Sequence, residues 1–421
     1  MKPLMLTIDF GTQSVRASLF DKQGNIIAIE KKSYNPPYFS PKVGYCEQDP
    51  KYYFDCMCEC TNNLAKNHPE ELKQAIAMTI TCFRDTAVLL DKDMNVIRPS
   101  VLWLDQRQAE GRKKLPLISR MIFALVGMTD AINLNRKRTV AVWLQENQPE
   151  VWEKIYKYVP VSTYITYLLT GELRDSASNC AGHYPLDFKK RQWYKKDNHL
   201  KGQLFGIPRK MLCDLLPEGS IVGNITKEAS ELTGIPENLK LYLSGSDKSC
   251  ETLGLGALDE NVGAISYGTA SSIEVTTKKY HDSETFLPAY PSCIPNYYNL
   301  EVQVYRGYWM LNWFTKEFAQ HETIEAAIQH ELVLDIMNEK MLAIPPGCDG
   351  LVLQPYWGPG LRRPLSKGAI IGFSDVHTKE HLYRAIIEGI AYALREGLEH
   401  FEKVLHQKIK SLMISGGGSR S

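Results

Sequence analysis

Two glycine turns in the sequence carry the residue types that bind phosphate. The first turn, in TIDFGTQSVRASLF, consists of Gly11, Thr12, Gln13 and Ser14. Glycine lets the backbone approach a ligand closely, and backbone N–H groups and hydroxyls donate hydrogen bonds to phosphate oxygens. Asp9 ends the apolar run before this turn and could hold Mg²⁺ through water, because Mg²⁺ keeps much of its hydration shell. These residues indicate binding of a nucleotide phosphate.

The second turn repeats the pattern of the first. AISYGTASSIEVTT and TIDFGTQSVRASLF share a strand, an aromatic-Gly-Thr turn, a serine and a second strand, which predicts an internal duplication. The turn Gly268-Thr269-Ala270-Ser271 could then hold the nucleotide from the side opposite to the first turn. The alternative is that both segments are ordinary hairpins, because glycine-containing turns are common between strands.

Other phosphate-binding motifs do not fit the opening segment. Asp9-Phe10-Gly11 matches the metal-binding triad of protein kinases, but the few residues before it cannot contain the Gly-rich loop, the lysine strand and the His-Arg-Asp loop that must precede that triad. The chain has no G-x-x-x-x-G-K-[ST] segment, and no G-x-G-x-x-G segment follows a strand. A hairpin-type phosphate loop is the functional interpretation that remains.

Arg84 and Asp85, in TCFRDTAVLLD, could bind a polyol. A guanidinium donates and a carboxylate accepts hydrogen bonds, which suits adjacent hydroxyls. Trp103, in VLWLDQR, could pack one ring face on the C–H groups of a sugar. The alternative is a surface ion pair beside a core tryptophan.

Length and composition limit the class of protein. The 421 residues predict two or three domains, at about one per 150 residues. A formal net charge of +1 argues against a nucleic-acid partner, and no window approaches the roughly 20 apolar residues of a membrane helix. The N-terminus reaches an Asp too early for a secretory signal, so we expect a cytoplasmic protein. Its ten cysteines are expected to be reduced, with Cys56, Cys58 and Cys60 packed on a helix.

The hydrophobic pattern predicts a mixture of helices and strands. Helices are expected over 49–66, much of 106–170 and 379–405, strands over 74–82, 239–243 and 411–415, and hairpins over 4–32 and 87–105.

Four segments, in order, resemble the FGGY family of carbohydrate kinases, within the actin- and hexokinase-like ATPase superfamily. DFGTQSVRASLFDKQGNII resembles the family's first phosphate loop, and GSDKSCETLGLGALDENVGAISYGTASSI resembles its catalytic-Asp segment followed by the second phosphate loop. KGAIIGFSDVHTKEHLYRAIIEGIAYALREGLE resembles the C-terminal signature, and LMISGGGSRS resembles the adenine-side glycine turn. The resemblance runs along essentially the whole chain.

The resemblance implies an α/β fold with two RNase H-like (actin-like ATPase) domains and a central cleft. The first domain, expected over 1–245, would bind the sugar and carry the first phosphate loop. The second, expected over 246–421, would bind ATP. We expect this second domain to be incomplete, because family members continue beyond the position of Ser421 with further elements.

The resemblance assigns the general base to Asp247, which would take a proton from the sugar hydroxyl and lie with Asp9 at the metal site. The residues alone leave an alternative, because Asp is a favoured N-cap and a helix is predicted from Lys248. Further nucleotide contacts are implied in RGYWMLNWF and at the last glycine turn. These are Gly307, Asn312, Gly416, Gly417 and Gly418.

The combined prediction is an ATP- and Mg²⁺-dependent kinase of a small-molecule ketose or polyol, with a pentulose-type sugar favoured. No nucleic-acid or membrane partner is expected, and a homodimer is the assembly considered. Three alternatives stay open. The first is a glycerol kinase, because Arg84-Asp85 resembles the Arg-Glu pair of that enzyme. The second is a non-catalytic actin-like ATP-binding protein, and the third is a fragment that is inactive because it lacks C-terminal residues.

Overall fold

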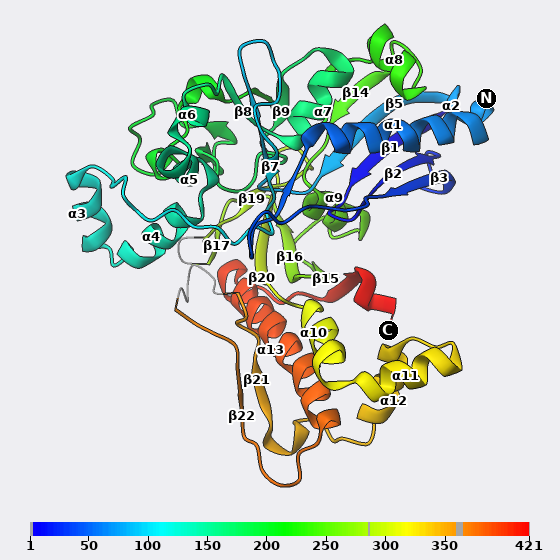
Figure 1. The fold of residues 1–421 in the computed structure, drawn as a ribbon, viewed down its shortest axis with the longest axis vertical. Coiled ribbons are helices and arrows are strands. Elements are labelled where there is room, and N and C mark those ends of the chain that lie inside the picture. The colour runs from blue at the N-terminus through cyan, green and yellow to red at the C-terminus, as the bar shows by residue number, and fades with distance from the viewer. Residues whose placement is uncertain (1–2, 285–286, 359–364, 421) are drawn as a thin grey trace. The chain divides into compact units, whose positions relative to one another are not determined.

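The structure is a computed structural model that describes residues 3–284, 287–358 and 365–420 (Figure 1). Ser421, the last residue of the predicted glycine turn, lies outside the described residues. The chain forms two units, Met1–Cys250 with Tyr290–Tyr297 and Glu251–Ala289 with Tyr298–Ser421. We predicted the division between residues 245 and 246, whereas here Asp247 belongs to the first unit.

The main sheet of the first unit has the strand order β13-β14-β5-β1-β2-β3. Its strands are β1 (Leu4–Phe10), β2 (Ser14–Phe20), β3 (Ile26–Ser33), β5 (Ala75–Cys82), β13 (Ile221–Asn224) and β14 (Lys240–Leu243). Strands β1, β2 and β3 form the antiparallel meander predicted at the N-terminus, whereas β1, β5 and β14 are parallel. The segments that follow these three parallel strands therefore meet at one edge of the sheet, where ligand sites of α/β folds commonly form.

Helix α1 (Pro50–Asn67) covers part of this sheet and confirms the prediction over 49–66 (Figure 1). Asp49 begins it as N-cap, with its side chain accepting a hydrogen bond from the Lys51 N–H at 2.9 Å. Tyr53, Met57, Cys60 and Leu64, spaced three or four residues apart, form its buried stripe, and the helix packs on β2 and β3. Cys56, Cys58 and Cys60 are free thiols on this helix, as predicted.

The other elements of the first unit surround the sheet or extend from it. They are β4 (Glu47–Gln48), α2 (Pro69–Leu72), β6 (Ala87–Leu90), β7 (Ser100–Val101), α3 (Leu117–Leu125), α4 (Thr129–Arg138), α5 (Val140–Asn147), α6 (Pro149–Trp152), β8 (Lys157–Pro160), α7 (Val161–Thr170), β9 (Arg174–Ser176), β10 (Leu186–Asp187), β11 (Gln192–Trp193), β12 (Asp214–Leu216), α8 (Lys227–Thr233), the first half of α9 (Asp247–Gly254) and β19 (Tyr290–Pro291).

The hairpin predicted over 87–105 is present around its turn, where the Ile97 N–H donates to the Leu89 carbonyl at 2.9 Å, but its second arm then pairs with another strand. A turn does connect Leu90 to Val96 through an isolated bridge, but β6 pairs with β8 and β7 pairs with β4. Arg98 forms an ion pair with Glu47 of β4, and Pro99 lacks the N–H that a continuing hairpin needs. The strand β7 in the second arm therefore pairs with β4, while the Ser100 hydroxyl still donates to the Ala87 carbonyl of β6 at 2.7 Å.

The second unit repeats the topology of the first. β20 (Tyr298–Val304), β16 (Ser271–Thr277), β15 (Val262–Tyr267) and β23 (Ser411–Ser415) are neighbours in that order. β15 is antiparallel to β16, β16 is antiparallel to β20, and β15 is parallel to β23. This matches the relation of β1 to β2, β2 to β3 and β1 to β5, so the predicted duplication is present in the fold.

Helix α13 (Lys379–Leu405) packs on β16 and β20 of this unit and has the predicted bounds. Gly389 of this helix is a packing position, since a Cβ there would lie 2.6 Å from the Leu353 carbonyl oxygen. The remaining elements are β17 (Asp282–Glu284), β18 (Leu287–Pro288), α10 (Trp309–Phe318), α11 (Gln320–Gln329), α12 (Val333–Met341), β21 (Val352–Gln354) and β22 (Ala369–Ile371). Across the described residues, no helix combines the length and the apolar content needed to cross a bilayer.

Candidate active site

The ends of β1, β5 and β14 bring carboxylates to one edge of the first sheet. The Ser244 hydroxyl donates to the Ile80 carbonyl at 2.5 Å, and the Thr81 hydroxyl donates to the Gly245 carbonyl at 2.8 Å. These bonds fix the segment after β14 against the end of β5. Burial, followed by the carboxylates of Asp175, Asp9 and Asp247, raises the pKa of the Cys82 thiol at that end. Three carboxylates that lie far apart in the sequence therefore act on the same thiol at this end of β5.

Asp247 is the first residue of α9, directly after the turn that leaves β14. It is half-buried, and its Oδ1 accepts a hydrogen bond from the Lys248 N–H at 2.8 Å. The carboxylate thus bonds the first turn of the helix, as the N-cap alternative supposed. A half-buried carboxylate at a helix start can also accept a proton from a bound hydroxyl, so the helix contact does not exclude catalysis.

The first glycine turn is a tight connection between β1 and β2. The Gly11 N–H donates to the Ser14 carbonyl at 3.0 Å, and Ser14 is buried at the start of β2. The indole N–H of Trp103 donates to the Thr12 hydroxyl at 3.1 Å, which orients that side chain. Asp9 forms an ion pair with Arg16 at 2.9 Å, and about two-fifths of each side chain is exposed. The turn and Asp9 therefore present donors and a carboxylate next to each other.

Asp85 and His183 form a hydrogen-bonded pair that the sequence alone did not predict. Asp85 Oδ2 lies 2.5 Å from His183 Nδ1, and Asp85 Oδ1 accepts from the His183 N–H at 2.8 Å. Asp85 has a φ of 58°. Gly182 has a φ of 125°, and a Cβ at this position would overlap the Asp85 side chain. Arg84 stacks on the ring of Tyr290 at 4.8 Å. Arg84, Asp85 and His183 are thus held by defined contacts, which suits recognition of hydroxyls.

The pair predicts a specific pH dependence for the variant Asp85→Asn. Although burial opposes both charges, His183 lowers the pKa of Asp85, and Asp85 raises the pKa of His183. The stabilisation is therefore present between these two pKa values and is lost as pH rises through the raised pKa of His183 or falls through the lowered pKa of Asp85. We expect the wild type to unfold at a higher urea concentration than Asp85→Asn near neutral pH, and this difference to shrink toward both extremes.

Histidine NMR titration of the two proteins gives the direct check. The pKa of His183 should fall in Asp85→Asn relative to the wild type. An unchanged His183 titration would contradict the pairing.

A second buried cluster lies under the segment that carries His183. Asp175 is fully buried and accepts hydrogen bonds from the Ser162 and Thr163 hydroxyls at 2.6 and 2.7 Å. It also accepts from the Asn179 amide at 2.8 Å and from the Ser176 N–H at 2.7 Å. The Ser176 hydroxyl in turn donates to the Ser244 carbonyl at 2.8 Å. Asp175 therefore supports the turn that ends at Asp247.

The segment 290–297 returns to the first unit beside α9. The Cys293 N–H donates to the Ser249 hydroxyl at 2.7 Å, and Cys293 Sγ lies 3.3 Å from the Ser249 carbonyl oxygen. A hydrogen bond from the Cys293 thiol lowers the pKa of Cys250 to about 7. Because the same segment supplies Tyr290 to Arg84, it connects the start of α9 with the Arg84 side of the site.

The predicted nucleotide residues of the second unit also come together. The Gly268 N–H donates to the Ala270 carbonyl at 3.1 Å, and the Gly268 carbonyl accepts from the Tyr308 N–H at 3.2 Å. Gly416 has a φ of 88° and packs on the backbone of Tyr267, while Gly418 packs on the Tyr308 ring. Asn312 is exposed on α10, one turn beyond these contacts. The second loop, residues 307–308 and the last glycine turn thus form one surface.

Gly307 is the tightest of these positions, because a Cβ there would overlap Ser271 at the start of β16. We expect Gly307→Ala to displace the second loop and weaken ADP binding by tenfold or more, measured by calorimetry. Gly254→Ala is a matched control, since nothing lies within 4 Å of its added Cβ. Equal ADP affinity in Gly307→Ala and Gly254→Ala would contradict the role given to this loop.

Comparison with known proteins identifies the family. Residues 4–254 match the N-terminal domain, and residues 263–421 the C-terminal domain, of the FGGY family of carbohydrate kinases. The chain belongs to this family. The predicted α/β fold of the actin-like ATPase type and the predicted activity class are thereby confirmed, so the protein is an ATP-dependent sugar kinase with an alcohol group as acceptor.

Several relatives of this kinase are similar along its whole length. A xylulose kinase of Lactococcus lactis is 29% identical over 99% of this chain and 80% of its own. A gluconokinase of Bacillus subtilis is 25% identical over 100% of this chain and 81% of its own. Among solved structures, a xylulose kinase from Lactobacillus acidophilus has a TM-score of 0.80 at 22% identity, covering 100% of this chain and 82% of that one. A glycerol kinase from Plasmodium falciparum has a TM-score of 0.72 at 18% identity, with 100% and 82% covered.

Proposed function

We propose that this kinase transfers the γ-phosphoryl group of ATP to a hydroxyl of a ketose or polyol, with a pentulose-type sugar favoured. The observation that supports the proposal is the place of Asp9, the Arg84-Asp85 segment and Asp247, each at or just after the end of one of three neighbouring parallel strands. The relatives named xylulose kinases support the pentulose preference. Glycerol kinase remains the second candidate, because of the Arg84-Asp85 pair.

Asp247 has the central role in the proposed mechanism. The acceptor hydroxyl would lie within hydrogen-bond reach of its carboxylate, which takes the proton as the oxygen attacks the γ-phosphorus. The bond between the γ-phosphorus and the bridging oxygen breaks as the new bond forms, and ADP leaves. The hydrogen bond from the Lys248 N–H to Oδ1 helps to hold the carboxylate in place.

The phosphate loops would hold ATP for this transfer. Backbone N–H groups of the first loop, with the hydroxyls of Thr12 and Ser14, are proposed donors to the phosphates, and Trp103 orients the Thr12 hydroxyl. We propose the same role for Gly268 and Thr269 in the second unit, with adenosine against Gly416, Gly417 and Gly418. On this assignment the first unit binds the sugar and the second binds most of the nucleotide.

The residues present fit a Mg²⁺ ion that arrives with ATP. Mg²⁺ is commonly held by one or two carboxylates together with substrate phosphates and water. Within the described part of the chain, no group of three or more His, Cys, Asp or Glu side chains could hold a metal by itself. Asp9 and Asp247 near the first phosphate loop meet the smaller requirement. The ion would neutralise charge on the phosphates during transfer.

Arg84, Asp85 and His183 are the proposed sugar contacts. Although burial opposes it, the Asp85 carboxylate raises the pKa of His183 and bonds its ring, so the two groups together offer acceptors and donors to adjacent hydroxyls. Arg84, Asp85 and His183 together can bind more hydroxyls than the Arg84-Asp85 pair alone. This feature favours a pentulose or longer polyol over glycerol.

A screen of acceptors tests the proposal. ADP release would be measured with pentuloses, hexuloses, pentitols, erythritol, gluconate and glycerol, each with and without Mg²⁺. We expect the largest kcat/KM with a pentulose. A preference for glycerol would move the assignment to the second candidate, and ATP hydrolysis that is independent of any acceptor would support a non-catalytic actin-like ATP-binding protein instead.

A further inference from the structure

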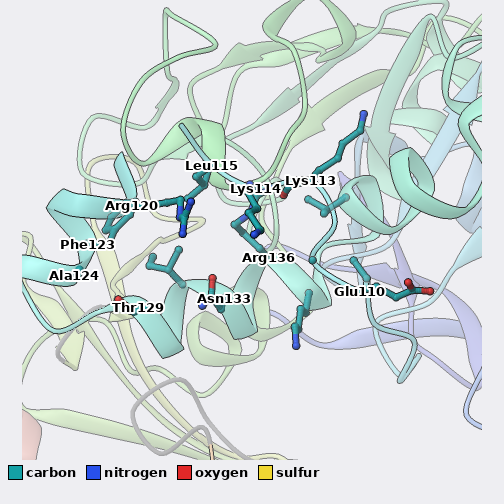
Figure 2. Close-up of a pocket in the computed structure, with 15 residues that line it drawn as sticks. Glu110, Lys113, Lys114, Leu115, Arg120, Phe123, Ala124, Thr129, Asn133 and Arg136 are labelled. Atoms are coloured by element: carbon teal, nitrogen blue, oxygen red, sulfur yellow. Dashed lines mark hydrogen bonds between the residues drawn. The ribbon is translucent and has the colours of Figure 1, made fainter. Parts of the chain in front are cut away.

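We propose that a cavity between α3 and α4 binds a small organic phosphate, at a site separate from the one that carries out phosphoryl transfer. The cavity has a volume of about 380 Å³, within the range of small-molecule sites, and lies in the first unit (Figure 2). None of its lining residues is among the proposed sugar or nucleotide contacts. The site is therefore a second one on the same unit.

The floor of this cavity is apolar. Leu115, Phe123 and Ile132 line it, and with Leu204 they form a small hydrophobic cluster apart from the main core. Such a floor excludes water from one side of a ligand and packs on carbon and hydrogen atoms. Thr129 and Asn133 of α4 line the cavity as well and offer hydrogen bonds to hydroxyls.

The rim is strongly basic in a chain of nearly neutral charge. The lining includes five cations and a single carboxylate, that of Glu110, which forms an ion pair with Arg112 outside the lining at 3.2 Å. The five cations are Lys113, Lys114, Arg120, Arg136 and Lys137. Over the whole chain, 49 Lys and Arg residues face 48 Asp and Glu residues. The excess at this rim therefore departs from the average and favours an anion of two or more charges.

Three of these five cations are not neutralised by contacts within the described part of the protein. Across the described residues, neither an ion pair nor a hydrogen bond engages the side chains of Lys114, Arg120 and Lys137. Helix dipoles explain only part of the pattern. Lys137 lies in the last turn of α4, where a cation is favoured, but Arg120 lies near the start of α3, where it is disfavoured. Figure 2 shows the nitrogen ends of Arg120 and Lys114 in the space between the helices, with Glu110 extending away.

The rim is held in place before any ligand binds. Arg136 donates to the Lys113 carbonyl at 2.7 Å and to the Leu204 carbonyl at 3.1 Å, and burial lowers its pKa. The Glu146 carboxylate accepts from the backbone N–H groups of Glu110 and Lys113 at 2.8 and 2.9 Å. The loop before α3 is thereby fixed to α4 and α5, so little ordering would oppose binding.

These features together select the ligand class. Several unpaired cations fit the two negative charges of a phosphate monoester, and the apolar floor with Thr129 and Asn133 fits a sugar or similar carbon skeleton. Inorganic phosphate would satisfy the rim but leave the floor uncovered. A nucleic acid would need a basic track along the surface, whereas this charge surrounds one hollow.

Calorimetry with glucose 6-phosphate as the probe tests the site, with glucose and inorganic sulfate as comparison ligands. Saturating AMP-PNP with Mg²⁺ occupies the proposed nucleotide site and prevents reversal of the transfer. We expect saturable binding of glucose 6-phosphate, weaker binding of sulfate and none of glucose. The affinity should fall by several-fold between 20 and 300 mM NaCl, because the contacts are exposed and ionic.

Variants locate the binding. The double variant Lys114→Ala with Arg120→Ala should weaken glucose 6-phosphate binding by tenfold or more. Lys195→Ala with Lys196→Ala removes two exposed cations elsewhere on the unit and should change it by less than twofold. Both pairs are exposed, so thermal unfolding should match the wild type in each. Absence of saturable binding in the wild type, or equal affinity in both double variants, would overturn the proposal. Neither result bears on the transfer reaction, which the Asp247 variant tests.

Discussion

Replacement of Asp247 by Ala is expected to lower kcat for sugar phosphorylation by 10²-fold or more while leaving ADP affinity within about threefold of the wild type. The physical reason is the position of the carboxylate. It begins α9 after a turn held by Ser244 and Thr81, it is half-buried, and we propose that it lies beside the acceptor hydroxyl. Removing it takes away the proton acceptor but leaves the backbone donors of both loops unchanged.

Two measurements complete this test. Steady-state kinetics with the best acceptor of the screen give kcat and KM, and calorimetry gives the dissociation constant of ADP. Asp247→Asn keeps the side-chain shape and the hydrogen bond from the Lys248 N–H. Because it lacks the proton-accepting carboxylate, it should be as inactive as the Ala variant. Loss of ADP binding together with retained phosphorylation would exclude Asp247 as the base, and full activity in Asp247→Asn would do the same.

Local patterns in the sequence were enough to predict the two glycine turns and the turn that leads to Asp247. Gly11 and Gly268 stand in turns between strands that are consecutive in the chain, so both the turn and its neighbours are visible within some fourteen residues. Asp247 follows an apolar strand in the same way. The long helix over 379–405 was predictable for a related reason, since its buried stripe recurs every three or four residues.

Residues that depend on distant partners could not be predicted in this way. His183 bonds Asp85, which is 98 positions earlier, and Trp103 bonds Thr12 across 91 positions. No periodicity marks either pair, because each depends on how β5 and the loops around it are stacked. The sequence did not predict that residues 290–297 belong to the first unit, for the same reason. This segment lies between two stretches of the second unit in the sequence, but it contacts α9 of the first unit.

Asp175 shows what such a hidden residue can contribute to stability. It is completely buried, and four donors, from Ser162, Thr163, Ser176 and Asn179, converge on its carboxylate. We expect Asp175→Ala to lower the free energy of unfolding of the first unit by about 3–5 kcal/mol, because the donors would be left buried without an acceptor. Urea unfolding followed by tryptophan fluorescence measures this loss.

A neighbouring acidic residue provides the control. Asp214 of β12 pairs in register with Arg174, next to Asp175, but its side chain is 76% exposed and forms a surface ion pair with Arg209. Asp214→Ala should cost at most about 1 kcal/mol. Asp175→Asn should lie between the two, since an amide keeps one acceptor oxygen.

The same variants separate support of the fold from support of the site. The Ser176 hydroxyl connects the Asp175 cluster to the Ser244 carbonyl, three residues before Asp247. Asp175→Asn, assayed well below its unfolding midpoint, should therefore lower kcat by several-fold more than Asp214→Ala, with KM for ATP unchanged. A stability loss in Asp175→Ala no larger than that of Asp214→Ala would show that the buried carboxylate does not hold this turn.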